Sequence, residues 1–391
     1  MGTATPIYDV DLYSDEVHLN PFPHFKKLRD LGAAVWLPQH DAWAIPRYKD
    51  VKESLRNTDV FVSGQGVALN DKFNGIMRGN AVTADGDLHT KLRKVMGKPM
   101  LPGALTAIAA RVQATADALS EQLVAQGTFD AVTDLAHHLP MSLVTEFVGL
   151  SEDGRDHMLE WAAAAFDCVG PMNDRARASM EKIGDAVGYI NHCVATRAVR
   201  PDSWGDGIFQ AVDRGEISLE NAGHILMDYI FPSLDTTINV TSTLILHLAR
   251  SPEQYELLRN DPSLIPTAIN EAVRIDSPIR QFSRLVTRDF EIDGVTLKAN
   301  SRALMMFSSA NHDERKFEDP ERFDIRRKAG DHLGFGHGVH QCAGMHLAQL
   351  EIGCLLKAIL PKIKRFELVG EPKYSVNNVL RGMSSLPVTV H

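Results

Sequence analysis

Hydrophobic residues recur at helical spacing over most of the chain, and short alternating segments interrupt this pattern near both ends. The spacing predicts helices over residues 105–125, 135–150, 155–169, 175–197 and 265–275. Alternating apolar and polar residues predict short strands over residues 34–36, 43–45, 290–294 and 296–306. We therefore expect a mainly α-helical fold with a small β-rich subdomain. Because no internal repeat or linker divides the sequence, residues 1–391 are predicted to form a single domain.

The longest helical stretch, residues 218–250, is apolar on most sides, which predicts a helix through the protein interior. Pro232 stands near its middle. Proline has no N–H, so the carbonyl of Asp228 loses its helical partner and we expect a kink. Asp235 and Thr236 follow directly, which would place a carboxyl group and a hydroxyl group beside an open turn in apolar surroundings.

Two connecting segments are candidates for contact with a ligand. Residues 63–80 are glycine-rich and carry almost no periodic pattern, and long loops of this kind are uncommon unless they line a site or are disordered. The turn at residues 166–171 separates two predicted helices. An ordinary helix hairpin explains this turn equally well.

Composition and charge exclude several classes of protein. The net charge of -9, without any dense basic stretch, argues against a nucleic-acid partner. No apolar run approaches the length of about 18 residues that a membrane-spanning helix needs, so we expect no membrane association. Four irregularly spaced cysteines and the absence of a leader pattern predict a reduced, cytoplasmic protein.

One cysteine stands in a loop that leads directly into an amphipathic helix. The loop has the sequence Phe335-Gly336-His337-Gly338-Val339-His340-Gln341-Cys342-Ala343-Gly344. Free N–H groups and the positive end of the helix dipole favour the thiolate and would lower the pKa of Cys342. The glycines allow the backbone to approach a large flat group. Together these features predict a sulfur atom that binds a metal.

Two other interpretations of this cysteine were weighed. Free cysteines most often pack in the core, but the surrounding glycines and His340 argue against that here. A zinc site could use His337, His340, Cys342 and His346, yet zinc sites of this kind need a second ligand pair from another segment. The remaining cysteines are isolated in the sequence and are predicted to be structural: Cys168, Cys193 and Cys354.

The loop resembles the haem-binding loop of the cytochrome P450 superfamily, whose pattern F-G-x-G-x-H-x-C-x-G it matches at every fixed position. The resemblance implies the triangular, mainly helical fold of that family. It also implies a haem b (iron protoporphyrin IX) cofactor with Cys342 as the iron ligand, and with Phe335, His340 and Gly344 beside the haem.

Further motifs extend the resemblance over essentially the whole chain. His89 and Arg93, on the helix predicted over residues 85–98, match the family's H-x-x-x-R, which contacts the haem propionates. Arg284 would contact the second propionate. On the same predicted helix, Lys91, Lys94 and Lys98 remain for the outer surface. The tail at residues 377–388 resembles the closing hairpin of the family, whose tip reaches the substrate pocket.

Two polar motifs complete the comparison. Glu271 and Arg274 match the family's E-x-x-R, and Arg322 would complete a buried structural lock behind the haem. Asp235 and Thr236 match the catalytic acid-alcohol pair of the oxygen-activating segment. The sequence departs from the family at Pro232 and Ser233, where small residues are usual, and Ser233 adds bulk to the expected oxygen pocket. The hydroxyl of Thr236 can still bond the carbonyl of residue 232.

The resemblance implies a monooxygenase that inserts one atom of O2 into a small organic substrate. Electrons would come from a ferredoxin and an NAD(P)H-dependent ferredoxin reductase. A peroxide-driven peroxygenase remains an alternative, although that branch replaces the acid-alcohol pair with Arg-Pro. A haem-binding protein without turnover is a second alternative, and it would need no proton relay.

The expected substrate is small and aromatic, and the expected reaction is hydroxylation or O-demethylation. Several segments look most like the bacterial subgroup that oxidises para-substituted benzoates. Asp228 stands where that subgroup has a small hydroxyl residue, and it would repel a carboxylate, so a neutral aromatic compound is an equal candidate. A terpenoid is the runner-up. The residues expected to contact the substrate are Val67, Phe166, Phe231 and Phe282.

Overall fold

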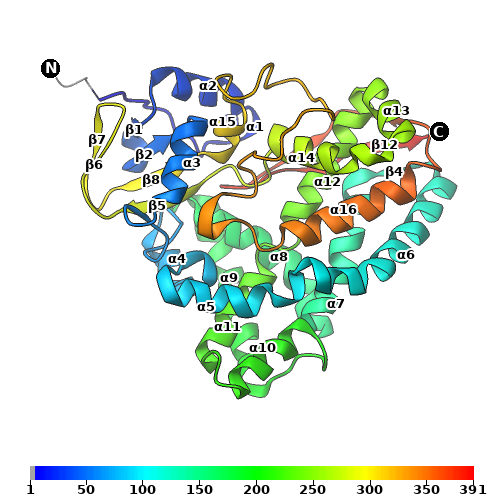
Figure 1. Cartoon of the computed structure of the whole chain (residues 1–391), viewed down its shortest axis with the longest axis horizontal. Helices are drawn as coiled ribbons and strands as arrows, with labels where there is room; N and C mark the ends of the chain where they lie inside the picture. The colour runs from blue at the N-terminus through cyan, green and yellow to red at the C-terminus, as the bar shows by residue number, and fades with distance from the viewer. Residues whose placement is uncertain (1–4) are drawn as a thin grey trace.

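Helices form most of the ordered structure of this protein, which is a computed structural model that describes residues 5–391. In Figure 1 they build a roughly triangular molecule, with the N-terminal sheet in one corner and the helices filling the rest. The helices are α1 (Asp15–Leu19), α2 (Phe22–Leu31), α3 (Tyr48–Arg56), α4 (Asp71–Ile76), α5 (Gly86–Gly97), α6 (Pro102–Gln126), α7 (Thr145–Val148), α8 (Glu152–Val169), α9 (Asp174–Thr196), α10 (Trp204–Asp213), α11 (Leu219–Ile230), α12 (Asp235–Arg250), α13 (Pro252–Asn260), α14 (Ile265–Ile275), α15 (Phe307–Asn311) and α16 (Met345–Ile359).

The strands are short and form small separate sheets. They are β1 (Val35–Leu37), β2 (Ala42–Ile45), β3 (Phe61–Val62), β4 (Thr128–Asp130), β5 (Phe282–Val286), β6 (Phe290–Ile292), β7 (Val295–Leu297), β8 (Arg302–Met305), β9 (Phe366–Leu368), β10 (Lys373–Val376), β11 (Arg381–Ser385) and β12 (Pro387–Val390). The largest sheet has the order β1-β2-β8-β5-β3, in which only β2 and β8 run parallel. The predicted fold class, mainly helical with a small β-rich part, is confirmed.

The main core lies among the helices. Buried apolar side chains from α6, α8, α11, α12, α14 and α16 form one large cluster, while a smaller cluster lies under the main sheet. α12 and α16 are neighbours near the centre of the molecule, and α6 runs along α16 (Figure 1). Cys168, Cys193 and Cys354 are buried, which confirms their predicted structural role. Among residues 5–391, no helix combines the length and the apolar character needed to cross a bilayer.

The predicted single helix over residues 218–250 is in fact two helices. α11 ends at Ile230 and α12 begins at Asp235, so Pro232 interrupts the helix rather than only bending it. The kink was therefore predicted at the correct position, but the helix is interrupted there and not only bent. Two other segments also differ from prediction. The loop at residues 63–80 contains the short helix α4, capped by Asn70, and much of residues 135–150 forms wide π-helical turns around Pro140.

Candidate active site

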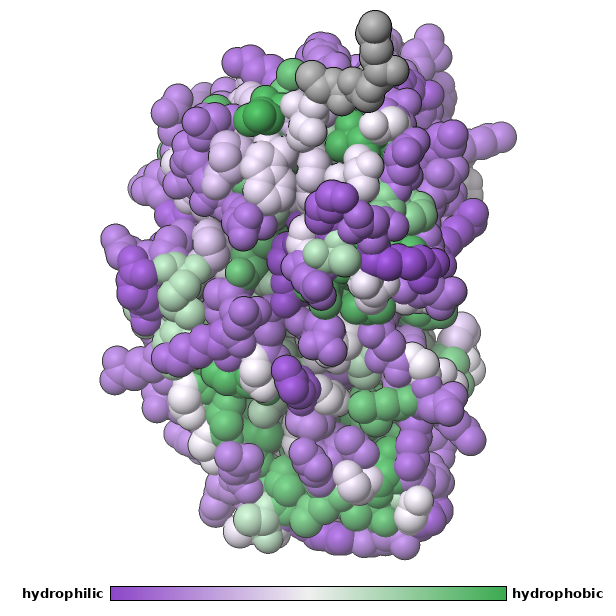
Figure 2. Space-filling view, turned by 90° about the vertical axis from the view of Figure 1, so that its left-hand side faces the viewer, coloured by the Kyte–Doolittle hydropathy of each residue, from purple (hydrophilic) through white to green (hydrophobic). Residues whose placement is uncertain are grey.

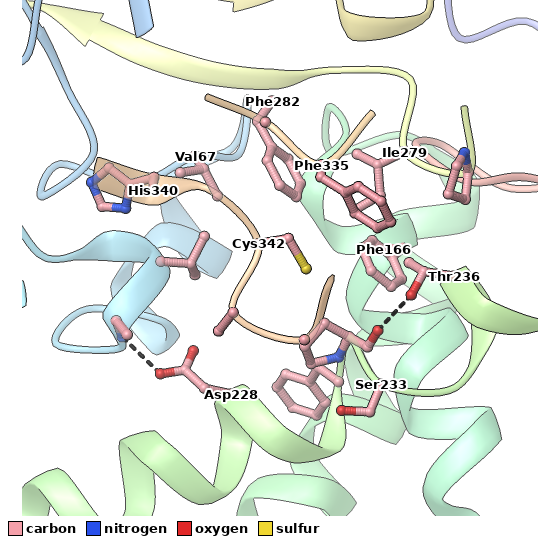
Figure 3. Close-up of a pocket in the computed structure, with 18 of the residues that line it drawn as sticks. Val67, Phe166, Asp228, Ser233, Thr236, Ile279, Phe282, Phe335, His340 and Cys342 are labelled. Carbon is pink, nitrogen blue, oxygen red and sulfur yellow. Dashed lines mark hydrogen bonds between the residues drawn. The ribbon is translucent and has the colours of Figure 1, made fainter. Parts of the chain in front are cut away.

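A large cavity lies between the Cys342 loop and the break that separates α11 from α12 (Figure 3). The space within it, including the part that opens to solvent, is about 1840 Å³. Aromatic side chains form much of its wall, and they come from α4, α8, the α11–α12 break, β5, α15 and the Cys342 loop. These residues are Phe73, Phe166, Phe231, Phe282, Phe307 and Phe335. Val67 also lines the cavity, so all four residues predicted to contact substrate lie in its wall.

Glycines shape the loop that carries Cys342. Gly336 and Gly338 have positive φ angles of 69° and 74°, which side chains with a Cβ rarely adopt. A Cβ on Gly338 would also lie 2.9 Å from the carbonyl oxygen of Leu55. The N–H of Cys342 donates to the carbonyl of Phe335 at 2.9 Å, and Gly344 caps α16. These contacts hold the sulfur of Cys342 at the cavity wall (Figure 3).

The expected lowering of the Cys342 pKa is wrong for this structure. Desolvation by the surrounding protein raises the pKa of the thiol above its usual value, although the side chain is exposed toward the cavity. The N–H of Gly344, the guanidinium of Arg93 and the N–H of Met345 act in the opposite direction, but they do not outweigh burial. Coordination to an iron cation would therefore stabilise the thiolate relative to the thiol.

Basic side chains gather along one edge of the cavity. Arg93 donates from Nη2 to the carbonyl of Gln341 at 2.7 Å, which ties α5 to the Cys342 loop. The rings of His89 and His340 lie with centroids 4.2 Å apart. Nε2 of His89 is buried and has no hydrogen-bond partner among the described residues, whereas Nε2 of His340 lies 3.6 Å from Oδ1 of Asp85. Arg284 is buried and also lines the cavity.

This set of groups fits a haem. A haem needs apolar contacts on both faces, cationic or N–H donors at its propionate edge and an axial ligand at its centre. The cavity offers aromatic walls, a basic edge with an unpartnered ring nitrogen on His89, and one thiol. The zinc alternative finds no support, because the described residues contain no cluster of three or more His, Cys, Asp or Glu side chains arranged to hold a metal ion.

The break between α11 and α12 presents several polar groups. The Thr236 hydroxyl donates to the carbonyl of Pro232 at 2.9 Å, as predicted (Figure 3). The Ser233 hydroxyl donates to the carbonyl of Tyr229 and so satisfies a group that the broken helix exposes. Oδ2 of Asp235 is buried and has no partner within residues 5–391, and burial raises the pKa of this carboxyl to about 7.

Asp228 also lines the cavity, on α11 one turn before the break. Its Oδ2 accepts the N–H of Ala81 at 2.7 Å, and its Oδ1 accepts Nδ2 of Asn80 at 3.3 Å. These contacts attach α11 to the 3-10 turn η2 (Ala81–Thr83). Burial raises the pKa of Asp228 to about 7, although its hydrogen bonds and Arg93 act to lower it. The sequence identified Asp228 as a negative group but gave no sign of its bonds to η2.

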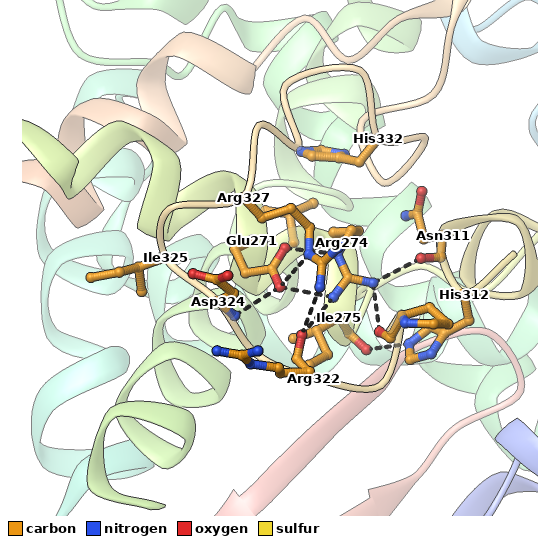
Figure 4. Close-up of polar contacts among 12 residues, drawn as sticks. Glu271, Arg274, Ile275, Asn311, His312, Arg322, Asp324, Ile325, Arg327 and His332 are labelled. Carbon is orange, nitrogen blue, oxygen red and sulfur yellow. Dashed lines mark hydrogen bonds and ion pairs between the residues drawn. The ribbon is translucent and has the colours of Figure 1, made fainter. Parts of the chain in front are cut away.

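The structural lock differs from the prediction in one residue. Glu271 and Arg274 are fully buried and pair through two bonds of 2.7 and 2.8 Å (Figure 4). The second guanidinium on Glu271 belongs to Arg327, at 3.1 Å, and not to Arg322. Arg322 contributes its backbone carbonyl, which accepts from Arg274 at 3.3 Å. The assignment of Arg322 was wrong because the turn at residues 319–327 places its main chain, rather than its side chain, toward Glu271.

The hairpin tip at residues 377–380 does not belong to the cavity wall that the structure describes. Asn378 instead donates to the carbonyl of Asp167 and receives a bond from Asn173, which connects the tip to α8 and α9. Leu380 pairs with Ile279, and Ile279 does line the cavity. The tip therefore supports the wall from behind.

Comparisons with known proteins identify the family. The cytochrome P450 family model matches residues 205–389. Cytochrome p450 CYP199A2 of Rhodopseudomonas palustris is 34% identical over 99% of this chain and 95% of its own length. Linalool 8-monooxygenase of Pseudomonas putida is 29% identical over 97% of this chain and 98% of its own length.

The solved structure of cytochrome P450 CREJ in complex with (4-ethylphenyl) dihydrogen phosphate superposes with a TM-score of 0.87. It is 25% identical and the match covers 96% of this chain and 98% of that one. The fold, the cavity with its thiol, and an identity of 34% over nearly the full length lead to one conclusion. The chain belongs to the cytochrome P450 family, and it is a haem b monooxygenase.

Proposed function

We propose that this enzyme hydroxylates or O-demethylates a small neutral aromatic compound, using O2 and electrons from a ferredoxin that an NAD(P)H-dependent reductase reduces. The observation that carries the proposal is the aromatic wall of the cavity, to which Phe166, Phe231 and Phe282 belong. Aromatic rings pack against one another in edge-to-face or offset arrangements, which adds to simple apolar burial. A planar ring is therefore the substrate shape that this wall favours.

The charged groups of the cavity argue for a neutral substrate. The basic residues of the described wall lie on α5, on β5 and in the Cys342 loop: Arg93, Arg284, His337 and His340. That edge is the one assigned to the haem propionates. On the wall formed by α11, the charged group is Asp228. A benzoate would place a second negative charge near this carboxylate in surroundings of low dielectric constant.

In this proposal Cys342 would hold the haem iron through its thiolate, and Phe335 and Gly344 position its loop. His89, Arg93, Arg284 and His340 hold the propionate edge by charge-assisted hydrogen bonds. The bound haem supplies the iron centre at which O2 is activated.

Proton delivery is assigned to the α11–α12 break. Asp235, with a pKa raised to about 7 by burial, can both hold and release a proton near neutral pH. The Thr236 hydroxyl, positioned by its bond to the carbonyl of Pro232, would orient that proton toward the cavity. The chain keeps this acid-alcohol pair, which favours O2 over peroxide as the oxidant.

A pair of substrates that differ in charge tests the proposal. The enzyme is loaded with haem and supplied with NADH and a surrogate ferredoxin system, and formaldehyde release is measured from 4-methoxytoluene and from 4-methoxybenzoate. We expect the neutral compound to shift the Soret band and to be demethylated, and the anion to do neither. The Cys342→Ala variant is the control, since it should lack the red-shifted band of a haem-thiolate carbon monoxide complex.

Other outcomes would replace parts of the proposal. Turnover of 4-methoxybenzoate alone would show that Asp228 does not repel anions. The similarity to linalool 8-monooxygenase makes a terpenoid the second candidate, so linalool belongs in the same screen. Oxidation that needs only hydrogen peroxide would contradict the assignment of a ferredoxin partner.

A further inference from the structure

We propose that Asp228 is a hydrogen-bond acceptor that selects substrates carrying a neutral donor, specifically a phenolic or benzylic hydroxyl group. This inference rests on the proposed aromatic substrate and narrows its class. The evidence for it is which hydrogen-bond donors and acceptors of the cavity wall remain available to a ligand.

The hydroxyl protons around the cavity are largely committed to the protein itself. The hydroxyls of Thr83, Tyr229, Ser233 and Thr236 each donate to a backbone carbonyl, those of Met77, Met96, Tyr229 and Pro232 respectively. The amide of Asn74 bonds to the backbone of Ala68 at both ends. These groups retain oxygen lone pairs but have no proton left for a ligand. Apart from Thr237 and the basic side chains, the polar side chains of the wall therefore offer a ligand acceptors more readily than donors.

Asp228 is the strongest of these acceptors. Its carboxylate accepts two hydrogen bonds, from Nδ2 of Asn80 to Oδ1 and from the N–H of Ala81 to Oδ2. A carboxylate has about four lone-pair positions, so about two positions remain. Asp228 lines the cavity (Figure 3), and its Oδ1 and Oδ2 each keep a lone pair besides the bond from Asn80 or Ala81.

The position of Asp228 on α11 places this acceptor beside the expected reaction centre. It precedes Phe231 and Pro232 by three and four residues, so the three residues share one face of the helix or its immediate continuation. Phe231 belongs to the aromatic wall. A ring packed against Phe231 would thus bring a hydroxyl substituent within reach of Asp228.

Protonation affects how well Asp228 accepts. Burial raises its pKa to about 7, while Arg93 of α5 and the N–H donors of η2 favour the ionised form. Tyr229, the other titratable neighbour, has its own pKa raised and stays neutral. The carboxylate form, present above pH 7, is the stronger acceptor. Discrimination in favour of a hydroxyl should therefore be larger at pH 8 than at pH 6.

The alternative role for Asp228 is purely structural, as the anchor of η2. The two roles make different predictions for a matched pair of ligands. 4-Methylphenol and 1,4-dimethylbenzene have nearly the same shape and differ by a hydroxyl in place of a methyl group. An anchoring role affects both ligands alike, whereas an acceptor role affects only the phenol.

The experiment measures Kd by Soret shift for both ligands in the haem-loaded wild type, Asp228→Asn and Asn80→Ala. The amide of Asp228→Asn keeps the size of the side chain but loses the charge. Since a hydrogen bond to a charged group is the strong kind, we expect this variant to lose about tenfold or more of the phenol preference. Asn80→Ala removes the amide donor to Oδ1 of Asp228 but keeps the carboxylate, so the phenol preference should be kept or increased.

Each outcome decides the question. An unchanged phenol preference in Asp228→Asn, or equal loss of that preference in Asn80→Ala, overturns the acceptor role. Absence of a phenol preference in the wild type overturns it too. If neither ligand shifts the Soret band although haem is bound, the proposed aromatic substrate fails instead, so the two failures are distinguishable.

Discussion

Glu351, on α16, is an interior carboxyl group that the proposed chemistry does not use. The residue is 1% exposed, and both of its carboxyl oxygens lack a hydrogen-bond partner within the described chain. Burial raises its pKa to about 8. Its neighbours Leu347, Ala348 and Ile352 line the cavity, so Glu351 lies on the helix face that turns toward it.

This carboxyl makes stability depend on pH. Its folded-state pKa of about 8 lies above the unfolded value of about 4.3, so folding takes up a proton between these limits. The free energy of unfolding should therefore fall as pH rises from about 4.3 to about 8. Replacement by the similarly sized leucine removes the unsatisfied carboxyl, and we expect Glu351→Leu to be more stable by about 1–3 kcal/mol at pH 8.

Urea denaturation of the variant and the wild type at pH 6 and pH 8 measures this effect. The gain from Glu351→Leu should be larger at pH 8. Glu253→Leu, at an exposed position of α13, is the matched control and should show no such pH dependence. A less stable Glu351→Leu would mean that buried water satisfies the carboxyl, since polar interiors of this kind commonly hold water.

At the scale of elements, the break between α11 and α12 carries two kinds of polar group. Hydroxyl groups satisfy the exposed carbonyls, and one carboxyl group is left without a partner within the described residues. Pro232 opens the helix, and the hydroxyls of Ser233 and Thr236 then bond carbonyls that the break exposes. The Asp235 carboxyl stands at the first position of α12. The unusual Pro-Ser pair is thus compatible with the same groove that glycine and alanine usually provide.

Two substitutions in this break should have different effects on turnover. Thr236→Ala removes the hydroxyl proposed to orient the proton, so NADH use should continue while peroxide replaces product. Asp235→Asn removes the ionisable group, so the rate of NADH use itself should fall, by about 10²-fold or more as for other acid–base groups. NADH, product and peroxide are measured in parallel. Full coupling in Thr236→Ala would assign the relay to another hydroxyl, with Ser233 the nearest candidate.

The sequence predicted the features that depend only on residues adjacent in the chain. The Cys342 loop was found because its glycines and its cysteine are neighbours in the chain, and the break near Pro232 because proline acts on its own turn. Arg327 was missed because no local spacing distinguishes it from Arg322; the choice depends on how the turn at residues 319–327 folds onto α14.

Contacts with residues distant in the sequence also determine the pKa values of Cys342 and Asp228. The sequence predicted a lowered pKa for Cys342 from adjacent N–H groups, but burial comes from distant segments and has the larger effect. The bonds from Asp228 to η2 span about 150 residues and left no trace in the sequence pattern. Sequence patterns thus gave the fold class and most of the residues of the site, but not the charge state of its groups.

At the scale of the whole molecule, surface charge bears on electron delivery. Figure 2 shows a face covered mostly by hydrophilic residues, with apolar residues in separate patches. The net charge is -9, yet Lys91, Lys94 and Lys98 are exposed on the segment that contains α5. α5 contacts the Cys342 loop through Arg93 and Gln341. These lysines share α5 and its continuation with Arg93, although Glu216 lies near Lys94 and Lys98. In a negatively charged protein, an acidic ferredoxin would gain electrostatic attraction at such a basic segment.

Reversing two of these charges tests the position of that docking surface. In Lys91→Glu/Lys94→Glu, we expect reduction of the haem by a ferredoxin to slow by roughly tenfold at low salt, since steering acts mainly on the association rate. Added salt screens exposed charges beyond about 10 Å, so the two proteins should converge at high ionic strength. Stopped-flow reduction across a salt series measures both effects. Lys27→Glu/Lys373→Glu changes the net charge equally at exposed positions of α2 and β10, and it should leave the rate near that of wild type. Equal slowing in the two variants would attribute the effect to net charge alone, and no slowing in either would place the docking surface away from α5.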